Sequence, residues 1–146
     1  MGDASERYRI LPHTADGKFQ AYGATLEEAF GNAALATASL MWDWAKIEPR
    51  TRYAIRVRAR DLEQLLVKFL GEVLYLFETR RFLLGEVTGL TIERGEADSR
   101  IEAVFIGDAV ADRYELFGDV KAVTYNEMKI EESDCGLSSV QVVVDM

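Results

Sequence analysis

The chain has 146 residues, 49% of them hydrophobic and 29% charged, and its formal net charge of −8 disfavours generic binding to a phosphate backbone, which depends on surplus lysine and arginine. A single histidine and a single cysteine exclude a histidine-rich zinc site and an internal disulfide within one chain. Since no apolar run approaches the roughly 20 residues of a membrane helix and the N-terminus lacks a signal peptide's apolar core, we expect one cytoplasmic domain over residues 1–146 with no membrane partner.

Two short strands are predicted near the N-terminus. Residues 8–11 form the first, and Pro12 ends it because proline cannot donate a backbone hydrogen bond to a sheet. Residues 13–17 are predicted as a loop. Residues 18–22 then alternate polar and apolar side chains, which is the two-residue period of a half-buried strand.

A helix is predicted over residues 26–44. It begins with a capping box, in which the Thr25 hydroxyl accepts from the Glu28 amide and the Glu28 carboxylate reaches back to the helix N-terminus. Alanine at many positions supports a helix and allows close packing on a sheet. We expect Trp42 and Trp44, near the end of this helix, to pack against the core rather than to stack on a ligand.

Residues 50–60 alternate between apolar and basic side chains. The apolar positions, which predict the buried face of a strand, are Tyr53, Ile55, Val57 and Ala59. The opposite face carries Arg50, Arg52, Arg56, Arg58 and Arg60. We favour a solvated sheet face for these arginines because the chain is acidic overall. The alternative is a local docking surface for RNA or an acidic partner.

The longest predicted helix covers residues 62–79. Asp61 is its N-cap, and large apolar side chains recur at helical spacing to form a broad stripe. This stripe is expected to lie on the sheet and to supply much of the core. Residues 87–93 and 100–106 are then predicted as a hairpin.

A polar loop is predicted over residues 107–118. It contains Asp108, Asp112 and Glu115, and three acids in a loop suggest calcium. Their spacing lacks the regular Asp-x-Asp-x-Asp-Gly pattern, however, so the match to a calcium loop is weak.

The C-terminal segment is predicted as a second hairpin. Residues 119–130 and 137–145 are rich in β-branched side chains, and the turn between them contains Cys135 and Gly136. The element order of two strands, a helix, a strand, a helix and several strands predicts an α+β fold. In this fold two helices pack on an antiparallel-rich β-sheet.

The last predicted strand ends unusually. Val142, Val143 and Val144 are strongly apolar, yet Asp145 follows directly and Met146 is the final residue. A carboxylate beside such a run is costly to desolvate unless it is paired or bound to a cation. From the residues alone we favour a strand end that frays into water, and the alternative is a cation site.

Several short segments, in their order and spacing, resemble the archease family over almost the whole chain. They are His13-Thr14-Ala15-Asp16, residues 21–30 with Asn32-Ala33-Ala34, Asp61-Leu62-Glu63 with Leu74-Tyr75-Leu76-Phe77, Lys121-Ala122-Val123-Thr124-Tyr125 and Val143-Val144-Asp145. Archeases are small activators of the RtcB-type RNA ligase of tRNA splicing and RNA repair. The resemblance implies that the chain is not an enzyme. It implies a protein that helps the ligase attach guanylate to its active-site histidine, sustains multiple turnover and broadens the nucleotides accepted.

The resemblance also implies a site. Asp16, Asp145 and the main-chain oxygen of Met146 are expected to hold a divalent cation, with calcium favoured and magnesium the alternative. Lys121 is linked to activation of the ligase, and His13 either shapes the loop or makes a structural hydrogen bond. The implied partner is the ligase, with only indirect contact to RNA, and the oligomeric state stays open.

The chain departs from the family pattern at several positions. Pro12 stands where the family usually has an aspartate, which removes one acidic ligand, and Asn126 stands where a titratable histidine is common. Two other functions remain open on the residues alone. One is a metal-dependent phosphoryl-transfer enzyme or hydrolase that uses the same acids, and the other is a chaperone-like binding module.

Overall fold

The computed structural model describes residues 6–12, 17–109, 111–134 and 136–146. These residues form seven strands, two α-helices and two short 3-10 helices. In chain order the elements are β1 (Tyr8–Leu11), β2 (Gly17–Gly23), α1 (Leu26–Ser39), η1 (Trp44–Lys46), β3 (Thr51–Ala59), α2 (Leu62–Arg80), β4 (Leu83–Arg94), β5 (Ser99–Asp108), η2 (Ala111–Arg113), β6 (Ala122–Glu131) and β7 (Ser138–Asp145). Both predicted hairpins, β4–β5 and β6–β7, are confirmed.

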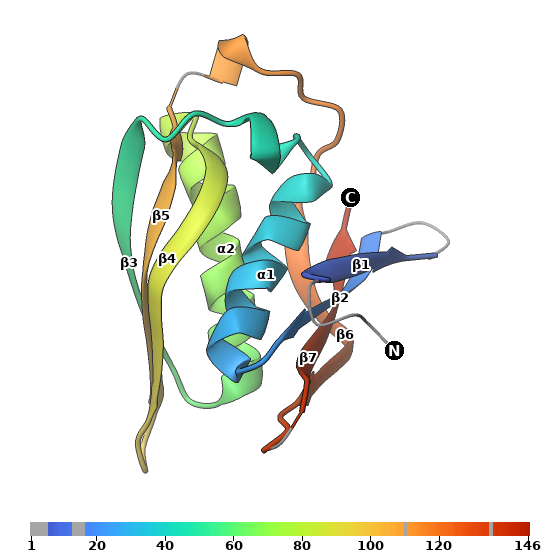
Figure 1. Cartoon of the computed structure of the whole chain (residues 1–146), viewed down its shortest axis with the longest axis vertical. Helices are drawn as coiled ribbons and strands as arrows, with labels where there is room; N and C mark the ends of the chain where they lie inside the picture. Colours follow the sequence, from blue (N-terminus) through green and yellow to red (C-terminus); the bar gives the residue numbers. More distant parts are fainter. Residues whose placement is uncertain (1–5, 13–16, 110, 135) are drawn as a thin grey trace.

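The strands divide into two antiparallel sheets. Four of them pair in the order β1-β2-β7-β6, and the other three pair in the order β3-β5-β4. The two helices lie between the sheets, with the four-stranded sheet on one side and the three-stranded sheet on the other (Figure 1). The predicted α+β class, with two helices packed on antiparallel β-structure, is confirmed.

An aromatic cluster joins both helices to the three-stranded sheet. The ring centroid of Phe69 in α2 lies 6.4 Å from that of Phe30 in α1 and 5.4 Å from that of Phe105 in β5. All three side chains are completely buried. The Phe69–Phe105 pair is edge-to-face and the Phe30–Phe69 pair is tilted, and such aromatic contacts add to the burial of apolar area. The apolar stripe predicted on residues 62–79 therefore forms the core, and neither helix among the described residues is long and apolar enough to cross a membrane.

Helix α1 starts as predicted but ends earlier. The Glu28 amide donates to the Thr25 hydroxyl at 3.1 Å, which confirms Thr25 as the N-cap, and the Glu28 carboxylate reaches back as predicted but accepts from the amide of Ala24, one residue before the cap, at 2.6 Å. The helix stops at Ser39 rather than at residue 44. The chain turns there because Trp42 is buried, with its indole nitrogen donating to a carbonyl oxygen of β4 at 2.9 Å.

The arginine-rich strand β3 has the predicted alternation, with its apolar side chains toward the core and its arginines in water. Two of these arginines lie beside acids of the β4–β5 hairpin. Arg56 contacts Glu102 at 3.2 Å, and Arg58 contacts Asp98 at 3.0 Å. Their positive charge is thus partly neutralised on the same face, as expected of a solvated sheet surface.

The predicted loop over residues 107–118 begins later than expected because β5 continues to Asp108. The Asp108 side chain is only 2% exposed. The Tyr114 hydroxyl donates to its carboxylate at 2.7 Å and accepts from the Glu48 amide at 3.1 Å. Burial raises the pKa of this tyrosine. Asp108 is therefore an internal hydrogen-bond acceptor, in keeping with the weak match to a calcium loop.

Candidate functional site

Strand β7 lies between β2 and β6 and ends at the predicted site. Val142 and Val144 are fully buried, whereas the side chain of Asp145 is exposed. Asp145 pairs with Ala122 of β6, and its carbonyl oxygen accepts from the Lys121 amide at 2.7 Å. The strand stays paired to its last residue, so the expectation of a frayed end is wrong for the backbone. It holds only for the Asp145 side chain, which does reach water.

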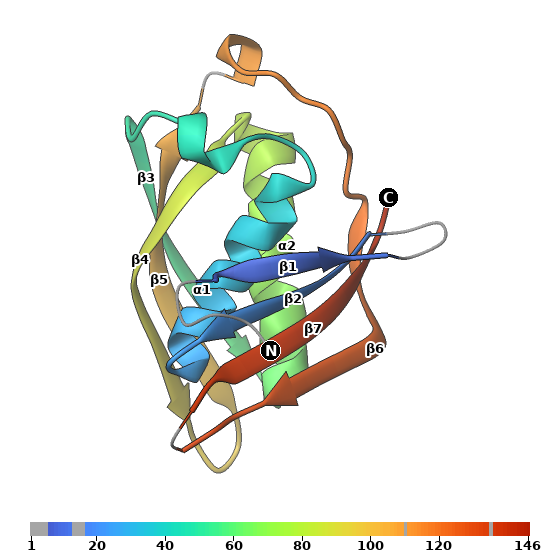
Figure 2. The ribbon, with the colours of Figure 1, turned by 45° about the vertical axis from the view of Figure 1, so that its right-hand side comes forward.

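The pairing brings the two predicted charged residues to one end of the four-stranded sheet, where β7 ends and β6 begins. Figure 2 shows the end of β7 beside the start of β6. Among the described residues, no hydrogen bond or ion pair engages the Lys121 ammonium or the Asp145 carboxylate. An ammonium and a carboxylate therefore stand at the ends of adjacent strands, and both are accessible to a ligand or partner.

The side chain of Met146 lies close to two glycines. A Cβ added to Gly17 would lie 3.0 Å from the Met146 sulfur and 2.9 Å from Val144 Cγ2. A Cβ on Gly118 would lie 3.6 Å from the terminal methyl of Met146. The thioether of Met146 thus lies against both backbones. Gly17 also pairs with Val144, so the main chain at the end of β7 lies beside the first residue of β2.

Asp16 directly precedes Gly17 in the chain, but Asp16 and His13 lie outside the described residues, as does Cys135 of the predicted turn. Their part in the site stays a prediction. Within the described ranges, no group of three or more histidine, cysteine, aspartate or glutamate side chains is arranged to hold a metal. The described part of the predicted ligand set consists of the Asp145 carboxylate and the main-chain oxygen of Met146.

Sequence reasoning missed a chain of hydrogen bonds across β2, β7 and β6. The Tyr22 hydroxyl donates to Gln20 Oε1 at 2.9 Å, and Gln20 Nε2 donates to Gln141 Oε1 at 2.9 Å. Gln141 Nε2 then donates to the Glu127 carbonyl oxygen at 2.8 Å. Burial raises the pKa of Tyr22. The available signal was a glutamine in each of the two strands β2 and β7, within runs of core residues.

This chain of hydrogen bonds ends at a bulge in β6. The register moves from Thr124 opposite Val143 to Lys129 opposite Gln141, so four residues of β6 stand opposite one of β7. Glu127, inside the bulge, has a φ of 52° and contacts Lys18 of β2 at 3.0 Å. The bulge therefore turns part of β6 toward the strand beyond its direct neighbour.

Solved structures define the class of this fold. The chain superposes on the solution structure of Methanobacterium thermoautotrophicum protein 1598 with a TM-score of 0.82, at 30% identity, covering 96% of this chain and 99% of that one. A crystal structure of a Thermotoga maritima archease, described as a possible chaperone, matches with a TM-score of 0.53 at 16% identity and covers 94% of this chain and 96% of that one. Two helices between two antiparallel sheets thus form an archease fold.

Comparisons of the sequence show which family the chain belongs to. The model of the Archease protein family (MTH1598/TM1083) matches residues 8–146. The chain is 40% identical to the archease of Methanosarcina barkeri, with 100% of both chains covered. It is 41% identical to the archease of Pyrobaculum neutrophilum, with 95% of both covered. The chain belongs to the archease family.

Proposed function

We propose that this chain activates an RtcB-type RNA ligase by promoting the attachment of guanylate to the ligase, and so sustains repeated RNA joining. Membership of the archease family supports the proposal. The observation that carries it is the bond between the Lys121 amide and the Asp145 carbonyl oxygen, which holds an exposed ammonium and an exposed carboxylate at one end of the four-stranded sheet. In this role the chain is a protein cofactor and not an enzyme.

A divalent cation fits the oxygen donors at the end of β7. The Asp145 carboxylate and the Met146 main-chain oxygen are hard ligands, and Asp16 would supply a second carboxylate. Calcium is favoured over magnesium because it accepts main-chain oxygens and irregular geometry more readily. The bound cation would bring positive charge to the exposed Asp145 carboxylate at the end of a strand whose preceding residue, Val144, is buried.

Lys121 is proposed to orient a phosphate of the nucleotide or of the partner's active site. An ammonium on a flexible stem is a compact point charge that suits phosphate oxygens. Its backbone amide is already bonded to β7, so the side chain alone is available for this contact. We propose that His13 supports the loop before β2, and that any contact with RNA passes through the ligase.

The test is an assay of ligase guanylylation and multiple-turnover RNA joining, with and without this protein. Wild type should accelerate both, whereas Asp16→Ala, Lys121→Ala and Asp145→Ala should not. Glu96→Ala, at an exposed acid outside the proposed site, is the matched control and should behave as wild type. Full activation by Asp145→Ala, together with unchanged calcium binding, would sink the proposal.

Other outcomes of the same assay point to the alternative functions. Turnover of a phosphate ester by the purified protein without any ligase would indicate a metal-dependent hydrolase. Protection of unrelated proteins from aggregation, unaffected by Asp145→Ala, would indicate a general chaperone, the role suggested for the Thermotoga maritima archease.

A further inference from the structure

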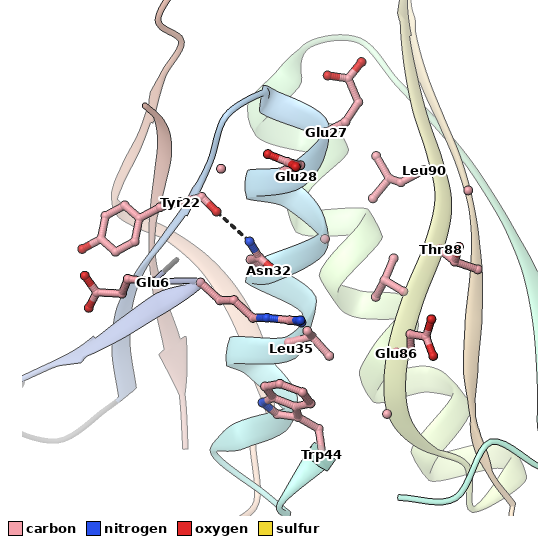
Figure 3. A pocket seen from close by; sticks show the side chains of 16 residues that line it. Glu6, Tyr22, Glu27, Glu28, Asn32, Leu35, Trp44, Glu86, Thr88 and Leu90 are labelled. Atoms are coloured by element: carbon pink, nitrogen blue, oxygen red, sulfur yellow. Dashed lines mark hydrogen bonds between the residues drawn. The ribbon is translucent and has the colours of Figure 1, made fainter. Parts of the chain in front are cut away.

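A groove of about 700 Å³ crosses α1 on a different part of the molecule (Figure 3). Its floor is the face of α1 that carries Asn32 and Leu35, and Trp44 closes one end. One wall is the segment that leads into β1, and the other is β4 from residue 85 to residue 90. None of Lys121, Asp145 and Met146 lines it. The groove is therefore separate from the candidate site at the end of β7.

The wall formed by β4 is the edge of a sheet. Successive side chains of a strand point to opposite faces, so a groove against one face would be lined by alternate residues. Here all six consecutive residues from 85 to 90 line the groove, although β4 pairs regularly with β5 only over residues 86–88 of this stretch and its register shifts on either side. Figure 3 shows Leu90 pointing toward α1 and Thr88 pointing away from it. The groove thus runs along the strand edge and meets both faces.

This edge is open for hydrogen bonding. β4 is the outer strand of its sheet and pairs only with β5. In the part of the chain that the structure describes, no backbone hydrogen bond from an element other than β5 reaches residues 86–90. An outer strand presents a row of unpaired amide and carbonyl groups and is a template for a further strand. The backbone of the groove wall is therefore open to a further strand along residues 86–88, where the pairing of β4 with β5 is regular.

The groove is also acidic. Four glutamates and one arginine line it. Glu28 is engaged in the cap of α1 and Glu6 contacts Arg9, but within the described residues no hydrogen bond or ion pair engages Glu27 or Glu86. The single cation, Arg7, lies over the Trp44 ring with its guanidinium carbon 5.1 Å from the centroid. Unmatched negative charge along an open edge favours a positively charged strand.

We propose that this groove binds an extended segment of a partner protein, in which basic and apolar residues alternate, by adding it as a strand to the edge of β4. Main-chain hydrogen bonds would supply affinity, as in other cases of strand addition. Apolar side chains of the segment would face α1, beside Leu35 and Leu90. Basic side chains on the other face would lie opposite Glu86 as cross-strand partners. The proposal does not depend on the ligase.

The probe is a blocked peptide of alternating lysine and valine, Lys-Val-Lys-Val-Lys-Val, with binding measured by calorimetry and by amide exchange. Two further peptides carry methyl groups on backbone nitrogens. One peptide is methylated at every lysine, and the other at every valine. Both keep the charge, but each loses the amide donors that point to one side. Strand addition predicts that one methylated peptide binds about tenfold weaker or worse and that the other binds like the parent. Exchange should slow within residues 86–88.

A pair of matched variants tests the role of charge. The double variant Glu27→Gln/Glu86→Gln should weaken binding of the parent peptide about fivefold, since exposed ion pairs are individually weak. Glu63→Gln/Glu96→Gln removes the same charge from exposed positions outside the groove and should change binding less than about twofold. Equal binding of both methylated peptides, equal losses in both double variants, or no binding at about 1 mM peptide would each overturn the proposal.

Discussion

The amide of Lys121 donates to the carbonyl oxygen of Asp145 across 2.7 Å, and this bond fastens the last residue of β7 to the chain entering β6. Neither side chain takes part in it. The backbone therefore stabilises this end of the sheet, and the Lys121 ammonium and the Asp145 carboxylate remain available to a ligand or partner. Activity and stability should accordingly be separable by mutation at both positions.

We expect Lys121→Ala and Asp145→Asn to melt within about 2 °C of wild type, because exposed substitutions away from buried contacts change stability by about 0.5 kcal/mol or less. Lys121→Pro removes the amide donor and should lower the melting temperature further than either. Thermal unfolding followed by circular dichroism measures all three. If Lys121→Ala proved as destabilising as Lys121→Pro, the side chain would have a structural role that this account does not give it.

Gly118 and Gly17 both lie against Met146, but substitution should cost them differently. A Cβ on Gly118 would overlap the Leu40 carbonyl oxygen, which belongs to rigid backbone. A Cβ on Gly17 would meet only the ends of side chains, which can move. We expect Gly118→Ala to lower the free energy of unfolding by about 2 kcal/mol or more, and Gly17→Ala by less. Urea unfolding gives both values, and the reverse order would contradict the packing described.

Tyr114 should stabilise the fold through its hydroxyl. In Tyr114→Phe the buried Asp108 carboxylate loses its donor and the Glu48 amide loses its acceptor. We expect a loss of about 1–3 kcal/mol in the free energy of unfolding. Tyr53→Phe is a suitable control because no hydrogen bond engages the Tyr53 hydroxyl among the described residues. Similar small effects of the two changes would show that the Asp108 contact contributes little.

Glu72 gives stability a distinct dependence on pH. Burial raises the pKa of its carboxyl above the ordinary value of 4.5, so the folded state holds the proton more tightly than the unfolded state. Its contribution to stability is fully present below the ordinary pKa and is lost as pH rises through the raised pKa. Glu72→Gln should therefore gain stability relative to wild type between acidic and neutral pH. Urea unfolding across this range would contradict the account if the difference stayed constant or fell.

Local patterns predicted the elements better than their assembly. The alternation in β3, the cap of α1 and the stripe of α2 each depend on neighbouring residues, and each appears as expected. The end of α1 does not, because it is set by the burial of Trp42 against β4. The division of the strands into two sheets likewise depends on contacts between distant segments, which no local period contains.

The same distinction between local and distant contacts applies to the candidate site. Lys121 and Asp145 belong to one hairpin, so the prediction that brought them together rested on local pairing and the family resemblance. The hydrogen bonds from Tyr22 to Glu127 cross three strands, and their existence depends on the register in which Gln20 meets Gln141. The groove beside β4 depends on how two sheets flank one helix. Neither feature has a signature along the chain.

The most direct test of the proposed function is the rate of guanylate transfer to an RtcB-type ligase in a single turnover. It is measured with labelled guanosine triphosphate, with wild type, Lys121→Ala or no added protein. We predict that wild type raises the rate and that Lys121→Ala loses about tenfold or more of this acceleration, equivalent to about 1.4 kcal/mol in the barrier. Equal rates with wild type and without added protein would contradict the account.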